Sequence, residues 1–155
     1  MFEKFTDRSR TVMNLASAEA ARRGDDSVDT VDVLVGMLRE GKKSIAWHVL
    51  SHHCSVPVDV DLVLAARQAV CDVPDVPLAE FVSQSHVEVK WLGHSYVGTE
   101  HLLLAVCALV RSRAARLLTA SGNPPVQVCS HVLDILGHFE LERWLVDHPD
   151  AAPSR

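Results

Sequence analysis

The sequence predicts an all-α fold, and three observations lead to that prediction. Apolar residues recur at the spacing of amphipathic helices, while the alternation typical of a half-buried strand is nearly missing. Aromatic residues make up only 5% of the chain, so few of the side chains that strands favour are present. Residues that start and stop helices flank the apolar segments. With 155 residues, 48% of them hydrophobic, the chain can bury a core as one domain.

Four helices are expected in the first half of the chain. Their expected starting points are Thr6, Thr30, Ser44 and Pro57. Thr6 can cap the first helix, and Pro57 is suited to the first turn of the fourth. Gly24 and Gly41 stand just past the first two helices, where glycine commonly ends a helix. Residues 72–77 contain two prolines and interrupt the helical periodicity, which predicts a linker between two halves.

The second half repeats this plan. Its expected helices are residues 78–92, a helix that starts at Thr99, residues 113–120, and a helix that follows Pro124 and Pro125. Thr99 is expected to cap its helix with its hydroxyl, and Glu100 to complement the positive end of the helix dipole. Apolar residues within 139–145 predict one or two further amphipathic turns. The last residues, 149–155, are expected to be frayed.

An internal repeat relates the two halves. The segment Gly93–Leu104 has a counterpart 69 residues earlier in the chain. The matching pairs are Val28 with Val97, Thr30 with Thr99, and Leu34 with Leu103. After this helix the offset falls to 68, which aligns Leu50 with Leu118. Because a one-residue change in a turn costs little free energy, two copies of one helical unit are predicted.

Two segments resemble a known family. Gly93–Leu104 reads GHSYVGTEHLLL and resembles the signature GHNYVGTEHLLL of the Clp N-terminal domain. Met1–Arg10 resembles the opening of the ClpC branch of these unfoldase ATPases. The resemblance implies two pseudo-twofold-related repeats of four helices. The implied divisions are repeat one at about 1–71, a linker at 72–77, repeat two at about 78–137, and a C-terminal extension at 138–155.

Composition and charge exclude several classes of function. A formal net charge of −5 argues against nucleic-acid binding, which needs a basic face. No apolar run approaches the length of a membrane span, and the N-terminus has alternating charges in place of a secretory signal. Four cysteines are scattered without a Cys-x-x-Cys pair, which favours reduced, mostly buried thiols in a cytoplasmic protein. These residues are Cys54, Cys71, Cys107 and Cys129.

The segment Gly36–Lys43 comes one residue from the phosphate-binding pattern G-x-x-x-x-G-K-[ST]. Lys43 stands where the pattern needs a hydroxyl for magnesium, and the segment ends an expected helix instead of following a strand. Nucleotide binding is therefore not expected. The ATPase modules of the Clp family are not found in this sequence, and no catalysis and no cofactor are expected of it.

Glu100 is the most informative candidate for a functional residue. In ClpC-type N domains, the glutamate of this motif is implicated in binding clients that carry phosphoarginine. The resemblance therefore implies a site at Thr99 and Glu100, where the carboxylate pairs with the guanidinium side and helix-terminal amides receive the phosphate. Repeat one has Val31 and Asp32 at the matching positions, so its site is expected to be inactive. The alternative is that Glu100 only stabilises the helix start.

A second implied surface for peptides or ligands involves Phe2, Arg10 and Ser83. In actinobacterial ClpC-like N domains, the face between the first helices of the two repeats binds cyclic peptide antibiotics. An exposed phenylalanine beside an arginine provides an apolar and a cationic anchor. Pro77, Ala79 and Ser83 depart from the residues usual in this family, so only half of the surface is retained. The alternative is that Phe2 packs on the core and Arg10 is solvated.

The metal-like cluster of the sequence comprises His48, His52, His53 and Cys54, of which His48, His52 and Cys54 are the candidate ligands. Histidines four residues apart share one face of a helix and can bind a metal together. No further acid or thiol is spaced to complete a tetrahedral site. A helix end with exposed histidines is therefore the preferred interpretation.

Basic residues near the third helix of each repeat form a candidate anion patch. They are Arg111, Arg113 and Arg116 in repeat two and Lys42 and Lys43 in repeat one. Ordinary surface charge is the preferred interpretation, because most exposed lysine and arginine side chains have no specific partner.

Three functional hypotheses follow from the sequence. The first is a non-catalytic module that binds proteins or peptides and acts as an adaptor, client receptor or competitor for a Clp unfoldase, with Clp components or their clients as partners. The second is a decoy that captures cyclic peptides directed at the unfoldase N domain. The third, from another class, is a metal protein or enzyme that uses His48, His52 and Cys54.

Overall fold

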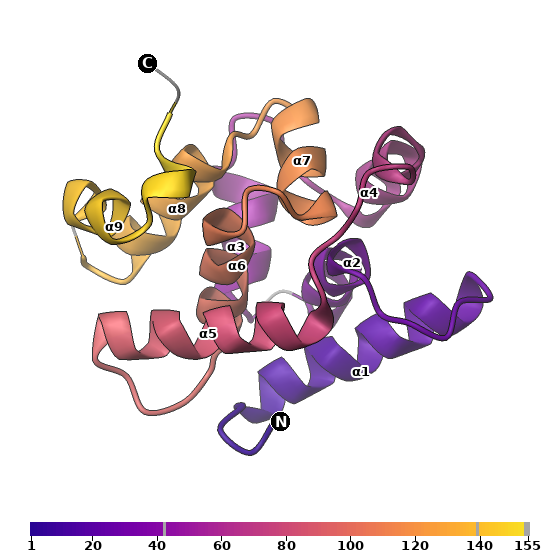
Figure 1. Ribbon diagram of the computed structural model, residues 1–155, viewed down its shortest axis with the longest axis horizontal. Coiled ribbons are helices and arrows are strands. Elements are labelled where there is room, and N and C mark those ends of the chain that lie inside the picture. The colour runs from indigo at the N-terminus through magenta and orange to yellow at the C-terminus, as the bar shows by residue number, and fades with distance from the viewer. Residues whose placement is uncertain (42, 139, 154–155) are drawn as a thin grey trace.

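A computed structural model describes residues 1–41, 43–138 and 140–153, and in these ranges the protein is all-helical, with no strand (Figure 1). The helices are α1 (Asp7–Arg22), α2 (Thr30–Glu40), α3 (Ile45–His48), α4 (Val60–Ala66), α5 (Leu78–Leu92), α6 (Thr99–Ala108), α7 (Arg113–Ala120), α8 (Pro125–Ile135) and α9 (Leu141–Asp147). Shorter turns are the π-helical η1 (Val49–His53) and the 3-10 segments η2 (Arg67–Val70) and η3 (Pro149–Ala151). The all-α prediction is confirmed. No helix within the described ranges is long and apolar enough to cross a membrane.

Local capping explains where several helices begin. The Thr6 hydroxyl accepts a hydrogen bond from the Ser9 amide at 3.2 Å, and Ser44 accepts one from the Trp47 amide at 3.0 Å. These are the capping residues that the sequence predicts for α1 and α3. In each case the side-chain oxygen satisfies an amide that has no partner within its own helix.

The fourth helix starts later than the sequence predicts. It begins at Val60, three residues after Pro57, because Asp59 is the capping residue and accepts the Leu62 amide hydrogen at 2.8 Å. The α-helix then gives way to the 3-10 segment η2 at Arg67. A carboxylate can accept the free amides of a first turn, whereas a proline only fixes φ.

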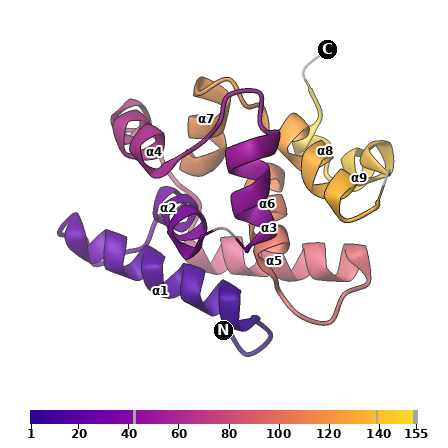
Figure 2. The same cartoon turned by 180° about the vertical axis from the view of Figure 1, so that it is seen from behind.

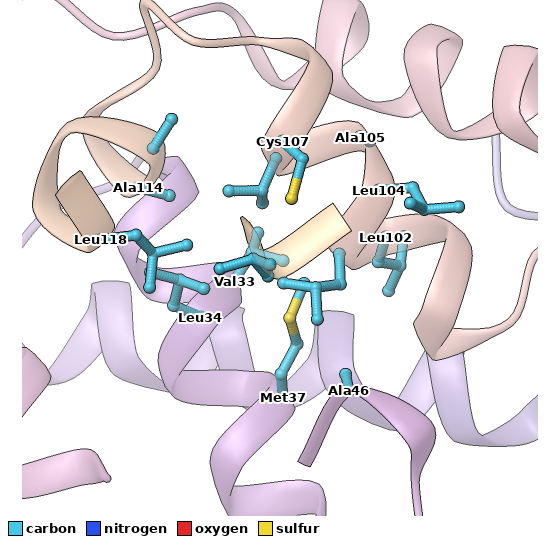
Figure 3. Close-up of a cluster of buried hydrophobic side chains, with 14 of the residues drawn as sticks. Val33, Leu34, Met37, Ala46, Leu102, Leu104, Ala105, Cys107, Ala114 and Leu118 are labelled. Atoms are coloured by element: carbon cyan, nitrogen blue, oxygen red, sulfur yellow. The ribbon is translucent and has the colours of Figure 1, made fainter. Parts of the chain in front are cut away.

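The core lies between the two central helices, α2 and α6. Almost every residue of both is buried. Helix α3 lies beside α6 near the centre of the molecule, α7 packs against α2 and α6 on the side away from α1 and α5, and α1 and α5 run along one edge (Figures 1 and 2). Figure 3 shows side chains from these central helices meeting in one cluster. Its labelled members are Val33, Leu34, Met37, Ala46, Leu102, Leu104, Ala105, Cys107, Ala114 and Leu118.

Gly36 permits a close contact between α2 and α1. A Cβ atom at this position would lie 2.4 Å from the carbonyl oxygen of Val12 and 3.3 Å from the amide of Ala16, both in the backbone of α1. Only glycine allows the helices to approach this closely. The first glycine of the near-match to a phosphate loop thus has a packing role inside α2, where no phosphate loop can form.

The C-terminal segment is more ordered than the sequence predicts. The amphipathic turns appear as α9, in which Trp144 is fully buried, although Phe139 lies outside the described residues. Residues 149–151 form η3 instead of fraying, and Ala151 is buried. Residues 154–155 lie outside the described part of the chain. Helix α9 lies beside α8 (Figure 2).

Candidate functional site

Thr99 lies at the start of α6, but it is not the capping residue. The N-cap is Gly98, whose amide donates a hydrogen bond to the ring of His101 at 2.8 Å. Because Thr99 is already inside the first turn, its hydroxyl faces the neighbouring helix α3 and accepts a hydrogen bond from the Ala46 amide at 3.4 Å. The predicted capping role of Thr99 is therefore wrong. Its side chain joins the starts of α6 and α3, and we call this contact the α3–α6 junction.

Repeat one has the corresponding junction between the starts of α2 and α7. Here the Thr30 hydroxyl accepts a hydrogen bond from the Ala114 amide at 2.9 Å. A carboxylate also occupies this α2–α7 junction. Asp75 accepts hydrogen bonds from the Thr30 amide at 2.7 Å, the Thr30 hydroxyl at 2.9 Å and the Arg113 amide at 3.0 Å. Helix N-termini carry partial positive charge, and the chain neutralises these two with its own side chain.

The α3–α6 junction has no such carboxylate. Thr6 stands 69 positions before Asp75, at the matching place, and its hydroxyl is hydrogen-bonded to Ser9. Within the described residues, nothing accepts the amide hydrogens of Ile45 and Thr99 or the hydroxyl hydrogen of Thr99. Three donors that correspond to the partners of Asp75 thus have no acceptor among the described residues.

A cavity of about 440 Å³ lies in front of these donors. It is lined by Thr6, Asp7, Arg8, Lys43, Ser44, Ile45, Gly98, Thr99 and Glu100. The Arg8 guanidinium is held 3.0 Å from the carboxylate of Glu40 in an ion pair, while Lys43 is an exposed cation at the edge. An anionic group that enters this cavity meets two backbone amides, a hydroxyl and a lysine, which donate the hydrogen bonds that a phosphate accepts. The carboxylates of Asp7 and Glu100 also line the cavity.

Glu100 is folded back over the start of its own helix. A Cβ atom added to Gly98 would stand only 2.5 Å from the Glu100 carboxylate, and that carboxylate lies 3.6 Å from Nδ1 of His101. This is the position expected of a residue that stabilises the helix dipole. No donor in the described part of the chain forms a hydrogen bond with the Glu100 oxygens. Both oxygens therefore remain able to accept hydrogen bonds from a ligand.

His94 and His101 form a hydrogen-bonded pair beside Glu100. His101 Nδ1 accepts the Gly98 amide hydrogen, so its Nε2 carries the proton and donates to His94 Nδ1 at 2.8 Å. Burial and the neighbouring His94 lower the pKa of His101 to about 4, which keeps it neutral at physiological pH. Among the described residues, His94, Glu100 and His101 are the one group of three whose ligand atoms lie within 4.8 Å of one another. Both nitrogens of His101 are already hydrogen-bonded, which disfavours a metal.

The metal-like cluster of the sequence is not assembled. His48, His52 and Cys54 do not bring their ligand atoms within 4.8 Å of one another. The ring of Trp47 instead packs edge-on against both histidines, at centroid distances of 5.2 and 5.0 Å. Cys54 is buried, and burial raises the pKa of its thiol to about 11, so the thiolate that a metal needs is disfavoured.

The described basic residues of the predicted anion patch do not gather at one place in the structure. Arg113 points inward, where its guanidinium donates hydrogen bonds to the carbonyls of Val73 at 2.6 Å and Cys71 at 3.1 Å. Lys43 lines the cavity at the α3–α6 junction, and Lys42 lies outside the described residues. Arg111 forms an ion pair with Glu80, and the Arg116 guanidinium donates to the Arg111 carbonyl.

Phe2 and Arg10 lie as their alternative interpretation expects. The ring of Phe2 is half-buried and packs edge-on against the buried Phe5, with centroids 5.0 Å apart. Arg10 is exposed and donates to the Glu3 carbonyl at 3.4 Å, and Ser83 is exposed on α5. A structural role of Phe2 thus accounts for its contacts, and binding of peptides by this surface stays a prediction.

Sequence reasoning missed Asp75 as a functional residue. It belongs to the predicted linker, and its partners lie 45 residues away at Thr30 and 38 residues away at Arg113. One signal was available, because Asp75 matches Thr6 at the repeat offset and replaces a neutral side chain with a charged one.

Comparisons with known proteins identify relatives of this chain in sequence and in fold. No family model matches the sequence. The chaperone protein ClpB of Oceanobacillus iheyensis is 34% identical over 145 residues, which cover 90% of this chain and 18% of ClpB. The chloroplastic chaperone protein ClpC of Pisum sativum is 32% identical over 143 residues, 88% of this chain and 16% of ClpC. The chain thus spans less than a fifth of the length of either relative.

A solved structure extends the comparison to three dimensions. The N-terminal domain of the chaperone ClpD from Arabidopsis thaliana matches with a TM-score of 0.70, covering 88% of this chain and 99% of that domain at 18% identity. This likeness establishes the fold, while the ClpB and ClpC relatives establish the sequence relationship. The chain is therefore similar to Clp N-terminal domains in sequence and in fold, and it resembles the N domains of ClpC-type unfoldases.

Proposed function

We propose that this chain is a non-catalytic module of the Clp proteolytic system that binds client proteins or peptides. One observation carries the proposal: donors at the α3–α6 junction that find no acceptor in the described part of the chain face a cavity that Glu100 also lines. The chemistry available there favours binding over bond cleavage. His101, the buried histidine of the site, is held neutral with both nitrogens hydrogen-bonded, and no nucleophile with an adjacent base lies among the cavity residues.

The proposed ligand is a phosphoarginine side chain on a client. Its phosphate fits the amides of Ile45 and Thr99 and the Thr99 hydroxyl, because these groups donate hydrogen bonds at the positive ends of two helical segments. Its guanidinium side fits the unbonded carboxylate of Glu100. Lys43 adds a cation at the cavity edge.

Repeat one supports a single site per chain. At the α2–α7 junction, the Asp75 carboxylate already takes the hydrogen bonds that a ligand phosphate would take. Val31, the counterpart of Glu100, is fully buried and apolar, so it offers no acceptor for a guanidinium. A second anion at this junction would also be repelled by Asp75.

Calorimetric titration of the full chain with a short phosphoarginine peptide tests this proposal. Glu100→Gln removes the negative charge at nearly constant volume, and we expect its dissociation constant to rise at least tenfold, since a charge-assisted hydrogen bond contributes about 1.5–3 kcal/mol. Thr99→Val removes the hydroxyl donor and is expected to weaken binding in the same direction.

Glu142→Gln is the matched control, because Glu142 is exposed on α9 and distant in sequence from the cavity. It should bind the peptide as the wild type does. The same peptide with unmodified arginine should bind far more weakly. Equal affinity of Glu100→Gln and wild type, or equal binding of the two peptides, would contradict the proposed ligand.

A further inference from the structure

A buried carboxylate in α5 is satisfied by the C-terminal segment. Glu88 is fully buried, and its Oε2 accepts a hydrogen bond from Trp144 Nε1 at 2.8 Å. Its Oε1 accepts from Gln84 Nε2 at 2.9 Å and contacts His148 Nε2 at 2.6 Å. Two of its three side-chain partners thus come from residues 140–151, which we call the C-terminal clasp.

The corresponding carboxylate in repeat one is satisfied differently. Glu19, 69 positions before Glu88, is also fully buried, and it pairs with Arg22 and Arg39 of its own repeat. At the same offset, repeat two has Trp91 and Ala108 in place of these two arginines. Repeat two therefore lacks its own counter-ions for Glu88, and the C-terminal clasp brings a histidine to that position.

Each ring nitrogen of His148 lies within hydrogen-bond distance of an oxygen atom. Nδ1 lies 2.7 Å from the Trp144 carbonyl oxygen, and Nε2 lies 2.6 Å from the Glu88 carboxylate. Both neighbours only accept hydrogen bonds when Glu88 is ionised, so His148 donates from both nitrogens as an imidazolium. Burial alone would lower the pKa of His148, but the hydrogen bond and the negative charge of Glu88 outweigh it and raise the pKa above its ordinary value. The ring also stacks on Trp144 at 4.0 Å.

The other charged groups around His148 do not replace it. On α5, Glu80 pairs with Arg111 from the segment before α7. On α9, Asp147 accepts a hydrogen bond from Trp91 Nε1 at 2.9 Å, and Asp150 of η3 is exposed. The thiols Cys107 and Cys129 of α6 and α8 stay protonated, because burial raises the pKa of both. In the described structure, His148 is the titratable cation that contacts Glu88.

We propose that the C-terminal clasp is a proton-dependent latch on repeat two, closed when His148 is protonated and loosened when it is neutral. Protonation of a group whose pKa is higher in the docked state stabilises docking. This stabilisation is fully present below about pH 6.5, the ordinary pKa of histidine, and it is lost as the pH rises through the higher pKa of docked His148. A neutral His148 ring can donate only one of these two hydrogen bonds, and it leaves Glu88 without a counter-ion.

Hydrogen exchange of the α9 amides, corrected for the intrinsic effect of pH on exchange, tests the latch in the full chain. Protection of residues 141–147 should fall as the pH rises through the midpoint of the His148 ring titration, followed by NMR in the same samples. The fall should approach tenfold for each pH unit by which that midpoint exceeds the value of free histidine. The amides of α2, in the other repeat, should keep their protection.

Two variants and a control make the test decisive. Glu88→Gln should lower the His148 midpoint, and His148→Gln should remove the pH-dependent loss of protection even if Glu88→Gln folds poorly. His52→Gln, at an exposed histidine in η1, should retain the wild-type profile. The latch is refuted if α9 protection is independent of pH in the wild type, if His148→Gln keeps the wild-type dependence, or if the His148 midpoint lies at or below that of free histidine.

Discussion

Replacing Trp144 by alanine is expected to lower the free energy of unfolding by about 3–5 kcal/mol, the range typical of a buried tryptophan. Trp144 is the largest of the fully buried side chains, and it packs in α9 against repeat two. The substitution leaves a large cavity and also removes the indole donor to the buried Glu88. Both effects lower the free energy of unfolding, because leaving a buried carboxylate without a hydrogen-bond donor destabilises the folded state.

Urea unfolding of three α9 variants measures this effect. Trp144→Phe keeps much of the apolar volume but lacks the N–H group, so its loss of stability should be smaller than that of Trp144→Ala. Val146→Ala is the control on the same helix, because Val146 is 76% exposed and should change little. If Trp144→Ala were no more destabilising than Val146→Ala, the docking of α9 onto repeat two would be wrong.

Replacing Asp32 by alanine should destabilise the protein by about 3–5 kcal/mol, as the removal of one partner from a buried ion pair generally does. The Asp32 carboxylate is fully buried, and it accepts hydrogen bonds from Arg23 and Arg67 and from the Asp29 amide. Without it, two partly buried guanidinium groups lose their principal acceptor. The Nε of Arg67 already lies buried without a partner in the described structure.

Thermal and urea unfolding of Asp32→Ala, beside Asp26→Ala, separates this effect from a general effect of charge. Both variants lose one negative charge, but Asp26 is exposed in the turn before α2 and should alter stability by less than about 0.5 kcal/mol. Equal stability of the two variants would show that the pairing of Asp32 with Arg23 and Arg67 does not hold α1, α2 and η2 together.

The sequence predicts those features that depend on neighbouring residues. Thr6 and Ser44 cap their helices as predicted, because a capping side chain reaches an amide only three residues away. The all-α fold and the resemblance to the Clp N-terminal domain are confirmed as well. The one-residue error at Thr99 reflects the preceding glycine, which takes the N-cap position while His101 accepts its amide hydrogen.

Contacts between residues distant in the sequence could not be predicted from the spacing of apolar and capping residues. Asp75 joins α2 of repeat one to α7 of repeat two. The relative placement of the two repeats depends on packing throughout the core. Trp144 and His148 reach Glu88 across 56 and 60 residues, and apolar periodicity alone carries no information about which face they cover. The predicted fraying of residues 149–155 was wrong for the same reason, since the burial of Ala151 arises from tertiary packing.

The α2–α7 and α3–α6 junctions differ in their contacts, although the two repeats are similar in sequence. Both place a threonine hydroxyl against the amide of a facing helix, at Thr30 and at Thr99. In repeat one the remaining donors are satisfied by Asp75, whereas in repeat two they face a cavity. The Asp75 carboxylate thus occupies the α2–α7 junction, whereas its counterpart Thr6 leaves the donors of the α3–α6 junction facing the cavity.

The number and location of bound phosphoarginine peptides test this account most directly. Calorimetry combined with NMR of the backbone amides should give one peptide per chain, with the largest shift changes at Ile45, Thr99 and Glu100. Two peptides per chain, or the largest changes at Thr30 and Arg113, would contradict it, because those results would mean that Asp75 does not occupy the junction in repeat one.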